Sequence, residues 1–222
     1  MRRMVPRDTV RDDSTADTQS RPYTPELVSR RPLGCLFEVV ETLVLTVVIF
    51  LVIQNFVAQP YRVEQESMER TLEQGQYLLV DKLTPRFDPY SRGDIVVFTP
   101  PGEDAGTSVP FIKRVIGLPG DQIEISDGQV LVNGFELDED GYVYDDQATQ
   151  PTGEDSSFEV EPDTLFVMGD HRSNSTDSRV FGPIPSTQVI GRAWLRYWPV
   201  DTLSIIQVPR YPDLSPAEAQ AP

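Results

Sequence analysis

One long apolar run dominates the pattern of hydrophobic and polar positions along this chain. From Leu36 to Ala58 almost every side chain is apolar, and the stretch from Thr42 to Val57 carries no charge. About 23 residues at about 1.5 Å each are enough to cross a hydrocarbon core of about 30 Å. A buried core helix would show one apolar stripe, whereas this run is apolar all round. We therefore predict a single transmembrane helix over residues 36–58.

Beyond Pro60 the apolar positions fall into short runs rich in Ile, Val, Phe and Tyr, with turn residues between them. Two of the separators, Asp127-Gly128 and Asn133-Gly134, are hairpin signals. This pattern predicts a mainly β fold, an antiparallel β-sheet domain that follows the single N-terminal transmembrane helix. The expected strands cover residues 76–83, 93–99, 111–117, 122–126, 129–133, 164–168 and 203–208.

The composition of the remaining segments predicts the domain organisation. Residues 1–35 form a polar tail that we expect to be disordered, and residues 59–208 form the folded domain. Within that domain, residues 100–110 read as a loop and residues 136–163 as an acidic insertion, in which Tyr142-Val143-Tyr144 is expected to form a short strand. Residues 209–222 are rich in Pro and Ala and are expected to be a flexible tail.

The charges around the apolar run predict its direction in the membrane. Segments rich in Lys and Arg beside a membrane span stay on the cytoplasmic side. The N-terminus is therefore expected in the cytoplasm and everything from Gln59 onward outside it. The chain would be a single-pass protein of the inner or plasma membrane. A cleaved secretory signal would have a shorter apolar core nearer the N-terminus. The arginines before the run are Arg2, Arg3, Arg7, Arg11, Arg21, Arg30 and Arg31.

Composition excludes several classes of function. The 222 residues carry a formal net charge of -16, which argues against a nucleic-acid partner. Cys35 is the only cysteine and His171 the only histidine, so neither a disulfide nor a zinc site of the usual ligands can form within the chain. We expect no metal and no cofactor.

Lys113 is the residue whose setting points most directly to chemistry. It is one of two lysines, and it sits in the apolar run Phe111 to Ile116, where loss of water would disfavour its ammonium form and make it a usable base. Ser67, a few residues after the apolar segment, offers a hydroxyl that such a base could activate. The other lysine, Lys82, reads as a surface residue, and His171 as a histidine in a solvated turn.

Four motifs in order resemble one known family. They are Ser67-Met68 with Thr71-Leu72, then residues 92–98, 111–121 and 169–182. Together with the preceding apolar run they resemble bacterial type I signal peptidase, also called leader peptidase, a membrane-anchored serine protease with a Ser/Lys dyad. The resemblance covers residues 38–198 but includes neither the N-terminal tail nor the acidic insertion.

The resemblance implies a role for each matching residue. Ser67 would be the acylating nucleophile, and Lys113 the general base that later protonates the leaving amine. Ser175 would hydrogen-bond to the lysine and orient it, while Asp177 and Arg179 would form an ion pair that holds their loop at the site. Six residues would line shallow pockets for the small side chains one and three residues before the cut: Tyr61, Val63, Met68, Leu72, Phe111 and Ile112.

The chain departs from the family pattern at three positions. Many members carry a serine or threonine as a second oxyanion donor two residues before the nucleophile, where this chain has Gln65, whose amide can also donate. Arg70 replaces the usual proline, and His171 the usual asparagine. The neighbouring carboxylates of Glu64 and Glu66 would favour the charged form of a nearby lysine and so oppose a lowered pKa.

The function expected from the resemblance is endoproteolytic removal of N-terminal signal peptides from exported preproteins, with the cut after small residues. The expected partners are these signal peptides and the lipid bilayer, with the export machinery as a further candidate. Two alternatives stay open: a Ser/Lys peptidase dedicated to a narrow set of clients, and a relative that binds signal peptides without cutting them. Cleavage of unrelated preproteins separates the three.

Overall fold

The structure, a computed structural model, describes residues 32–104, 107–153, 155–212 and 214. The predicted disordered tail therefore lies outside the described residues up to residue 31, as does most of the predicted C-terminal tail. The predicted membrane span falls on helix α1 (Pro32–Val52) and the π-helical turn η1 (Ile53–Val57), and its last residue begins strand β1. Among the helices of the described chain, none has both the length and the apolar character needed to cross a membrane.

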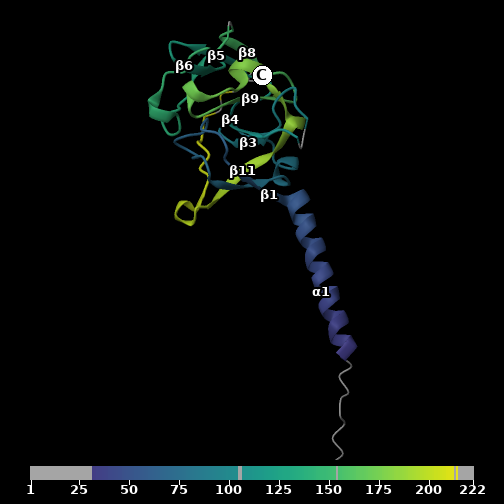
Figure 1. Cartoon of the computed structure of the whole chain (residues 1–222). Coiled ribbons are helices and arrows are strands. Elements are labelled where there is room, and N and C mark those ends of the chain that lie inside the picture. Colours follow the sequence, from purple (N-terminus) through teal and green to yellow (C-terminus); the bar gives the residue numbers. More distant parts are fainter. Residues whose placement is uncertain (1–31, 105–106, 154, 213, 215–222) are drawn as a thin grey trace, which may run out of the picture. The chain divides into compact units, whose positions relative to one another are not determined.

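The predicted mainly β, antiparallel architecture is confirmed. An eight-stranded sheet has the order β1-β2-β11-β3-β4-β9-β10, and β12 pairs with β11 (Figure 1). All of its paired strands are antiparallel. Its strands are β1 (Ala58–Arg62), β2 (Tyr77–Asp81), β3 (Ile95–Phe98), β4 (Phe111–Gly117), β9 (Thr164–Met168), β10 (Ile184–Pro185), β11 (Val189–Trp198) and β12 (Ser204–Ile205).

A smaller sheet of four antiparallel strands has the order β7-β6-β5-β8. Its strands are β5 (Gln122–Ser126), β6 (Gln129–Val132), β7 (Phe135–Glu136) and β8 (Ser157–Glu159), and the turns Asp127-Gly128 and Asn133-Gly134 connect the first three as predicted. Short helices complete the fold: η2 (Thr84–Arg86), η3 (Tyr144–Asp146), η4 (Arg172–Asn174), α2 (Ser178–Phe181), η5 (Ser186–Gln188) and η6 (Val200–Thr202).

Strands β4, β5 and β9 coincide with the predicted ranges, because each is a continuous or alternating apolar run between turn residues. The pattern of apolar positions did not predict β11, the ten-residue strand that pairs with both β2 and β3. It also missed β1, where Pro60 is tolerated because this strand lies at the edge of the sheet. The strand predicted at Tyr142-Val143-Tyr144 is wrong. This segment is a turn leading into η3, in which Asp145 and Asp146 have positive φ.

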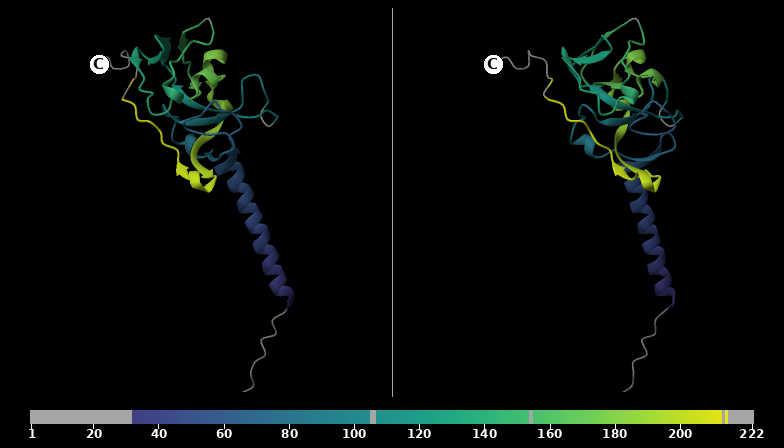
Figure 2. Two further views of the ribbon diagram at one scale, coloured as in Figure 1. Left: turned by 60° about the vertical axis from the view of Figure 1, so that its left-hand side comes forward. Right: turned by 90° about the vertical axis from the view of Figure 1, so that its left-hand side faces the viewer.

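Three apolar clusters form the core, and two of them lie against the strands that carry the candidate site. One joins Val63, Met68 and Leu72 to Leu78 of β2 and Ile95 of β3. Strands β3 and β4 are buried along almost their whole length. Figure 2 shows the C-terminal segment after β12 returning along the β domain, where Tyr211 and Leu214 pack against the cluster beneath the small sheet.

Candidate active site

Ser67 begins a tight turn that follows β1. The amide N–H groups of Thr71 and Leu72 donate to the carbonyl oxygen of Met68, which closes the turn, and Arg70 adopts a φ of 79° within it. The side chain of Met68 is 1% exposed and anchors this turn in the core. Ser67 itself is 5% exposed. The turn therefore presents its hydroxyl from a position that the core holds in place.

Lys113 reaches Ser67 from strand β4. Its Nζ donates to Ser67 Oγ at 2.6 Å and to the carbonyl oxygen of Ile112 at 3.2 Å. The ammonium also lies 5.1 Å from the centre of the Phe111 ring. Only 1% of the lysine is exposed, because the buried central strand β4 carries it into the interior. The two residues that sequence analysis singled out are thus in direct contact.

The setting of Lys113 changes its proton affinity. Burial lowers the pKa of its ammonium from the ordinary 10.5 to about 8, since the charged form loses its water. The carboxylates of Asp177 and Asp170 oppose this shift, and Arg179 adds slightly to it. The opposing charges are these buried aspartates rather than Glu64 and Glu66, the carboxylates suspected from the sequence. A substantial fraction of the amine is neutral near pH 8.

The loop after β9 supplies the buried ion pair expected from the sequence. Arg179 donates to both carboxylate oxygens of Asp177 at 2.8 Å, and both side chains are almost fully buried. Burial raises the pKa of Asp177, but the hydrogen bonds and charge of Arg179, together with the Gly169 amide and the Ser175 hydroxyl, outweigh it and hold that pKa below its usual range. Asp177 therefore stays ionised and fixes the loop.

Ser175 lies in the same loop but does not make the expected contact. Its hydroxyl donates to Asp177 Oδ2 at 2.7 Å, and within the described chain no hydrogen bond joins it to Lys113. Both residues nonetheless line one groove of about 470 Å³, together with Ser67, Gln65 and Phe111. Ser175 is thus linked to Asp177, the carboxylate whose charge raises the pKa of Lys113.

Of the six residues predicted to line substrate pockets, the structure brings four to the hollow or the groove beside Ser67. Val63, Met68 and Ile112 line a hollow of only about 10 Å³ beside Ser67, and Phe111 lines the larger groove. Leu72 instead lies in the core and borders a different cavity. Tyr61 packs against the same core cluster. Ser67 therefore borders both a small apolar hollow and the larger open groove.

A second buried ion pair next to the dyad was not predicted from the sequence. Arg114, which follows Lys113, donates to both oxygens of Asp170 at 2.8 and 2.6 Å, and each side chain is 1% exposed. Thr71 Oγ donates to Asp170 at 2.5 Å, so the pair joins β4, the serine turn and the loop after β9. An arginine inside an apolar run was the available signal, since a buried guanidinium requires a partner.

Both unusual residues beside the dyad contact the acidic insertion. Arg70 Nη1 donates to Asp146 Oδ1 at 2.8 Å and to the carbonyl oxygen of Val143. The ring of His171 stacks on Tyr144 with 4.2 Å between centroids, and its Nδ1 lies 2.9 Å from Glu69 Oε2. His171 is therefore not the solvated turn histidine expected from the sequence.

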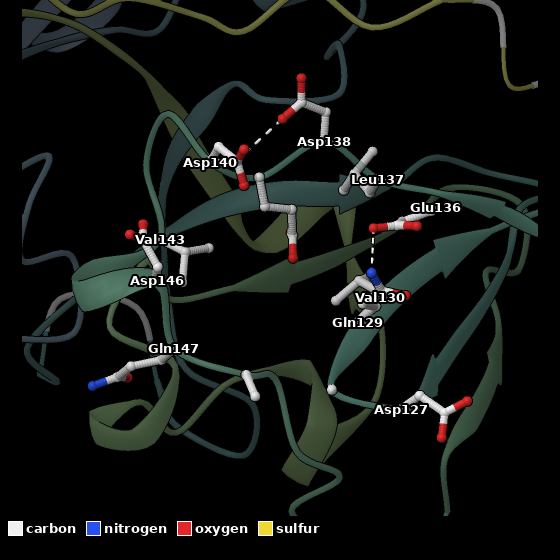
Figure 3. Close-up of a pocket in the computed structure, with 13 residues that line it drawn as sticks. Asp127, Gln129, Val130, Glu136, Leu137, Asp138, Asp140, Val143, Asp146 and Gln147 are labelled. Atoms are coloured by element: carbon white, nitrogen blue, oxygen red, sulfur yellow. Dashed lines mark hydrogen bonds between the residues drawn. The ribbon is translucent and has the colours of Figure 1, made fainter.

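The insertion and the small sheet also enclose a cavity of about 570 Å³ (Figure 3). Its lining is strongly acidic, and none of the predicted site residues belongs to it. Among the residues that the structure describes, no group of three His, Cys, Asp or Glu side chains is placed to hold a metal ion. The carboxylates lining the cavity belong to Asp127, Glu136, Asp138, Glu139, Asp140 and Asp146.

Comparison with known proteins supports the resemblance seen in the motifs. The sequence model of the family described as signal peptidase, peptidase S26, matches residues 36–198. A signal peptidase I of Leptolyngbya laminosa is 37% identical over 195 residues, which cover 86% of this chain and 94% of that protein. A probable signal peptidase I-1 of Synechocystis sp. is 39% identical over 174 residues, covering 76% of this chain and 85% of that protein.

A signal peptidase I of Bacillus caldolyticus is 39% identical over 156 residues, covering 65% of this chain and 81% of that protein. The region matched by the family model includes the serine turn, strand β4 and the loop after β9, the three segments that meet at the candidate site. The resemblance inferred from the four motifs is confirmed, and this chain belongs to the signal peptidase family, peptidase S26.

Proposed function

We propose that this member of the signal peptidase family removes N-terminal signal peptides from exported preproteins with Ser67 as its nucleophile and Lys113 as its general base. One observation carries the assignment of the two residues: the 2.6 Å contact between Ser67 Oγ and a lysine amine that is 1% exposed. A buried lysine with a pKa near 8 is suited to take a proton at moderately alkaline pH.

The geometry supports an acyl-transfer cycle. The neutral amine of Lys113 takes the proton of Ser67 as the oxygen attacks the carbonyl carbon of the scissile peptide bond. The resulting ammonium then protonates the leaving nitrogen, the carbon–nitrogen bond breaks, and the signal peptide remains esterified to the serine. In the second half, Lys113 takes a proton from water as the water attacks the ester, and Ser67 regains its proton when it leaves.

Two donors are available for the oxyanion in this scheme. The backbone N–H of Ser67 is one, and the side-chain amide of Gln65, which lines the same groove, is the other. Removing a donor of this kind costs about 10²- to 10³-fold in rate in other acyl-transfer enzymes. The longer Gln65 side chain would reach the oxyanion from a different point than a serine or threonine does in other members.

The shape of the site supports cleavage after small residues. The hollow lined by Val63, Met68 and Ile112 has a volume of about 10 Å³, so a side chain much larger than that of alanine would displace core residues. The groove beside it opens to solvent and has room for an extended peptide.

Part of the same proposal is that residues 36–58 anchor the enzyme in the inner or plasma membrane, with residues 1–35 in the cytoplasm and residues 59–208 outside. The exposed faces of α1 support this: its large apolar side chains have exposures from 48% at Val47 to 69% at Phe37. Water disfavours such a surface, whereas a bilayer would cover it. Anchoring would also raise the effective concentration of a signal peptide in the same membrane.

The membrane arrangement has its own test. We expect the wild-type chain to stay in the membrane fraction when membranes are washed with alkaline carbonate. A variant with both Leu45→Arg and Ile49→Arg should be released from the membrane, because each central arginine costs about 2.5–3.5 kcal/mol on insertion. Gln54→Arg, near the end of the run, is the matched control and should remain in the membrane fraction. Extraction of the wild-type chain would contradict the anchor.

The dyad is tested by cleavage of a signal-bearing preprotein in liposomes, with the new N-terminus mapped by mass spectrometry. Ser67→Ala and Lys113→Ala should each lower the rate by about four orders of magnitude or more. Lys82→Ala removes the other lysine of the chain and should leave the rate within twofold of wild type. Retained cleavage in either dyad variant would refute the assignment.

A narrow set of clients is the second candidate, and the acidic rim of the groove favours it. Glu64 and Glu66 line the groove and are exposed, so they would bias selection toward peptides without acidic residues near the cut. Assaying a panel of unrelated preproteins with the same enzyme preparation decides between the two. Cleavage across the panel excludes a narrow client set, while cleavage of one class alone supports it.

A further inference from the structure

Arg196 differs from every other arginine that the structure describes as buried or half-buried. It lies on β11 and donates only to neutral acceptors, including the carbonyl oxygens of Thr202 at 2.8 Å and Thr71 at 3.1 Å and Ser204 Oγ at 3.0 Å. Within the described chain no carboxylate oxygen lies within 4.0 Å of its guanidinium. The other buried or half-buried arginines each form an ion pair with a carboxylate. They are Arg92, Arg114, Arg172, Arg179 and Arg192.

The absence of a counter-charge at Arg196 matters because the chain is so acidic. It has 35 Asp and Glu residues against 19 Lys and Arg, so carboxylates are abundant elsewhere. A half-buried guanidinium has lost part of its water and still carries its full charge. This charge attracts a phosphate or carboxylate group. An external anion would supply what the fold does not.

Arg196 borders a cavity that is large enough for such a ligand. The volume is about 540 Å³, and Arg70 and Arg114 line it as well, whereas its lining contains neither Asp nor Glu. The cavity in Figure 3 is the reverse case, lined by six carboxylates and by neither lysine nor arginine. The two cavities are thus lined by charged side chains of opposite sign.

The three arginines of the cationic cavity are not equally available. Arg114 is neutralised by Asp170 and is 1% exposed, so it contributes the wall of the cavity rather than free donors. Arg70 bonds to Asp146 and Val143 through Nη1 only, and in the described chain its Nε and Nη2 make no hydrogen bond. Free donors therefore come mainly from Nε and Nη2 of Arg70. All three nitrogens of Arg196 already donate within the fold, including Nη1 to Gln76 Oε1 at 3.4 Å, so Arg196 contributes its uncompensated charge and one remaining N–H of Nη2.

Besides the polar residues Thr71, Ser204 and Gln207, the rest of the lining is largely apolar, which defines the class of ligand. Ile205 is 62% exposed and Val208 41% exposed at this cavity. On the same hairpin between β11 and β12, Trp198, Val200 and Leu203 are more than half exposed. Tryptophan and aliphatic side chains next to arginine are typical of the bilayer interface. A ligand with an anionic head and an apolar tail would fit both the arginines and these exposed apolar side chains.

We propose that this cavity binds the phosphate of an anionic phospholipid between Arg70 and Arg196, with the acyl chains along Ile205 and Val208. The site lies next to the catalytic elements, since Arg70 follows Ser67 by three residues and Arg114 follows Lys113. This inference extends the proposed membrane association, but it does not use Ser67, Lys113 or helix α1. Its failure can therefore be distinguished from failure of the proposed peptidase function.

The test is native mass spectrometry of the full-length chain carrying Ser67→Ala, in a nonionic detergent with added phosphatidylglycerol. We expect a saturable complex with one lipid, whereas phosphatidylcholine, whose head carries a balancing cation, should bind at least tenfold more weakly. Arg196→Gln should weaken phosphatidylglycerol binding about tenfold, and Arg70→Gln about three- to tenfold. Arg62→Gln removes an exposed arginine outside the cavity and should change binding less than twofold.

Arg70→Gln keeps the test decisive if Arg196→Gln fails to fold, because Arg70 is exposed and outside the core. Phosphatidylglycerol binding that is the same in the wild type, Arg70→Gln and Arg196→Gln would overturn the site. Glycerol phosphate, which has the head without the tail, separates the two sources of phosphate. Binding of glycerol phosphate as tight as that of phosphatidylglycerol would overturn the assignment to a lipid.

Discussion

Arg172 donates to both carboxylate oxygens of Glu139, from Nη1 to Oε2 at 2.7 Å and from Nη2 to Oε1 at 2.5 Å. Arg172 lies in the loop that carries Ser175 and Asp177, and Glu139 lies in the acidic insertion. The arginine side chain is 1% exposed and also donates to the carbonyl oxygen of Gly169. The insertion is therefore built into the support of the active-site loop.

Replacing Glu139 tests how much the fold depends on this pair. Glu139→Gln leaves the buried Arg172 without its anion, and breaking one partner of a buried pair costs about 3 kcal/mol. For a domain of this size the midpoint of thermal unfolding in nonionic detergent should fall by about 6–12 °C. Asp138→Asn removes the same charge from an exposed neighbouring position and should shift the midpoint by less than about 2 °C. Equal midpoints for both variants would contradict a supporting role of the pair.

The insertion also shows what a sequence alone leaves open. Its acidic composition predicts a solvated surface segment, and many of its carboxylates are exposed. Glu139 differs from the other carboxylates because it lies against Arg172, which is 33 residues away along the chain. Contacts of this kind depend on tertiary placement, which neither propensity nor spacing records. The same holds for Arg70 and Asp146 and for the stacking of Tyr144 on His171.

The apolar pattern predicted strand β4 but not strand β11, and both outcomes have a physical reason. Strand β4 was readable because its apolar run is continuous and is buried on both faces. Strand β11 was not readable, because Gly191, Arg192 and Arg196 interrupt its apolar positions. Register shifts between Ala193 and Leu195 and between Arg196 and Trp198 then break the alternation that identifies a strand. The lysine stood out in sequence because charged residues are rare in such an apolar run.

The pH dependence of cleavage follows from the setting of Lys113. Its pKa is lowered to about 8, and the neutral amine is the reactive form, so kcat/KM should rise about tenfold per pH unit below pH 8 and level off above it. The unfolded chain keeps the ordinary pKa of 10.5, so this group also makes the folded state more stable as pH rises from about 8 to 10.5. Cleavage measured from pH 6 to pH 10 provides the test. A rate that is constant from pH 7 to pH 9 would exclude Lys113 as the titrating base.

Asp177→Asn should move that profile to lower pH. The Asp177 carboxylate raises the pKa of Lys113, and without it the charge of Arg179, which lowers the same pKa, is no longer compensated. Both effects have the same sign. The plateau rate should fall about tenfold as well, because the fork to Arg179 that fixes the loop is weakened.

The control for this variant is Asp145→Asn, which removes one exposed carboxylate from the insertion and should leave both the midpoint and the plateau unchanged. A shift of the Asp177→Asn profile to higher pH would show that the carboxylate does not act on the lysine through its charge. A lower plateau with an unchanged midpoint would restrict Asp177 to holding the loop.

At Gly169 the serine turn and the active-site loop are closely packed, so a substitution there tests their packing directly. A Cβ placed there would lie 2.3 Å from Ser175 Oγ and 2.6 Å from the carbonyl oxygen of Ser67, closer than atoms approach without displacement. Gly169→Ala must therefore push the loop away from the turn. This movement weakens the hydrogen bond from the His171 amide to the same Ser67 oxygen, now 3.0 Å long.

Because a misplacement of about 1 Å can cost about 10²-fold in rate, we expect kcat/KM of Gly169→Ala to fall by about that factor, with the pH midpoint near 8 retained. Gly141→Ala is the matched control, since a Cβ there meets no atom within 4 Å, and its rate should stay within twofold of wild type. Steady-state cleavage of the same preprotein by both variants makes the comparison. Wild-type activity in Gly169→Ala would mean that the loop can move without disturbing Ser67, and the close packing of loop and turn would then have no part in catalysis.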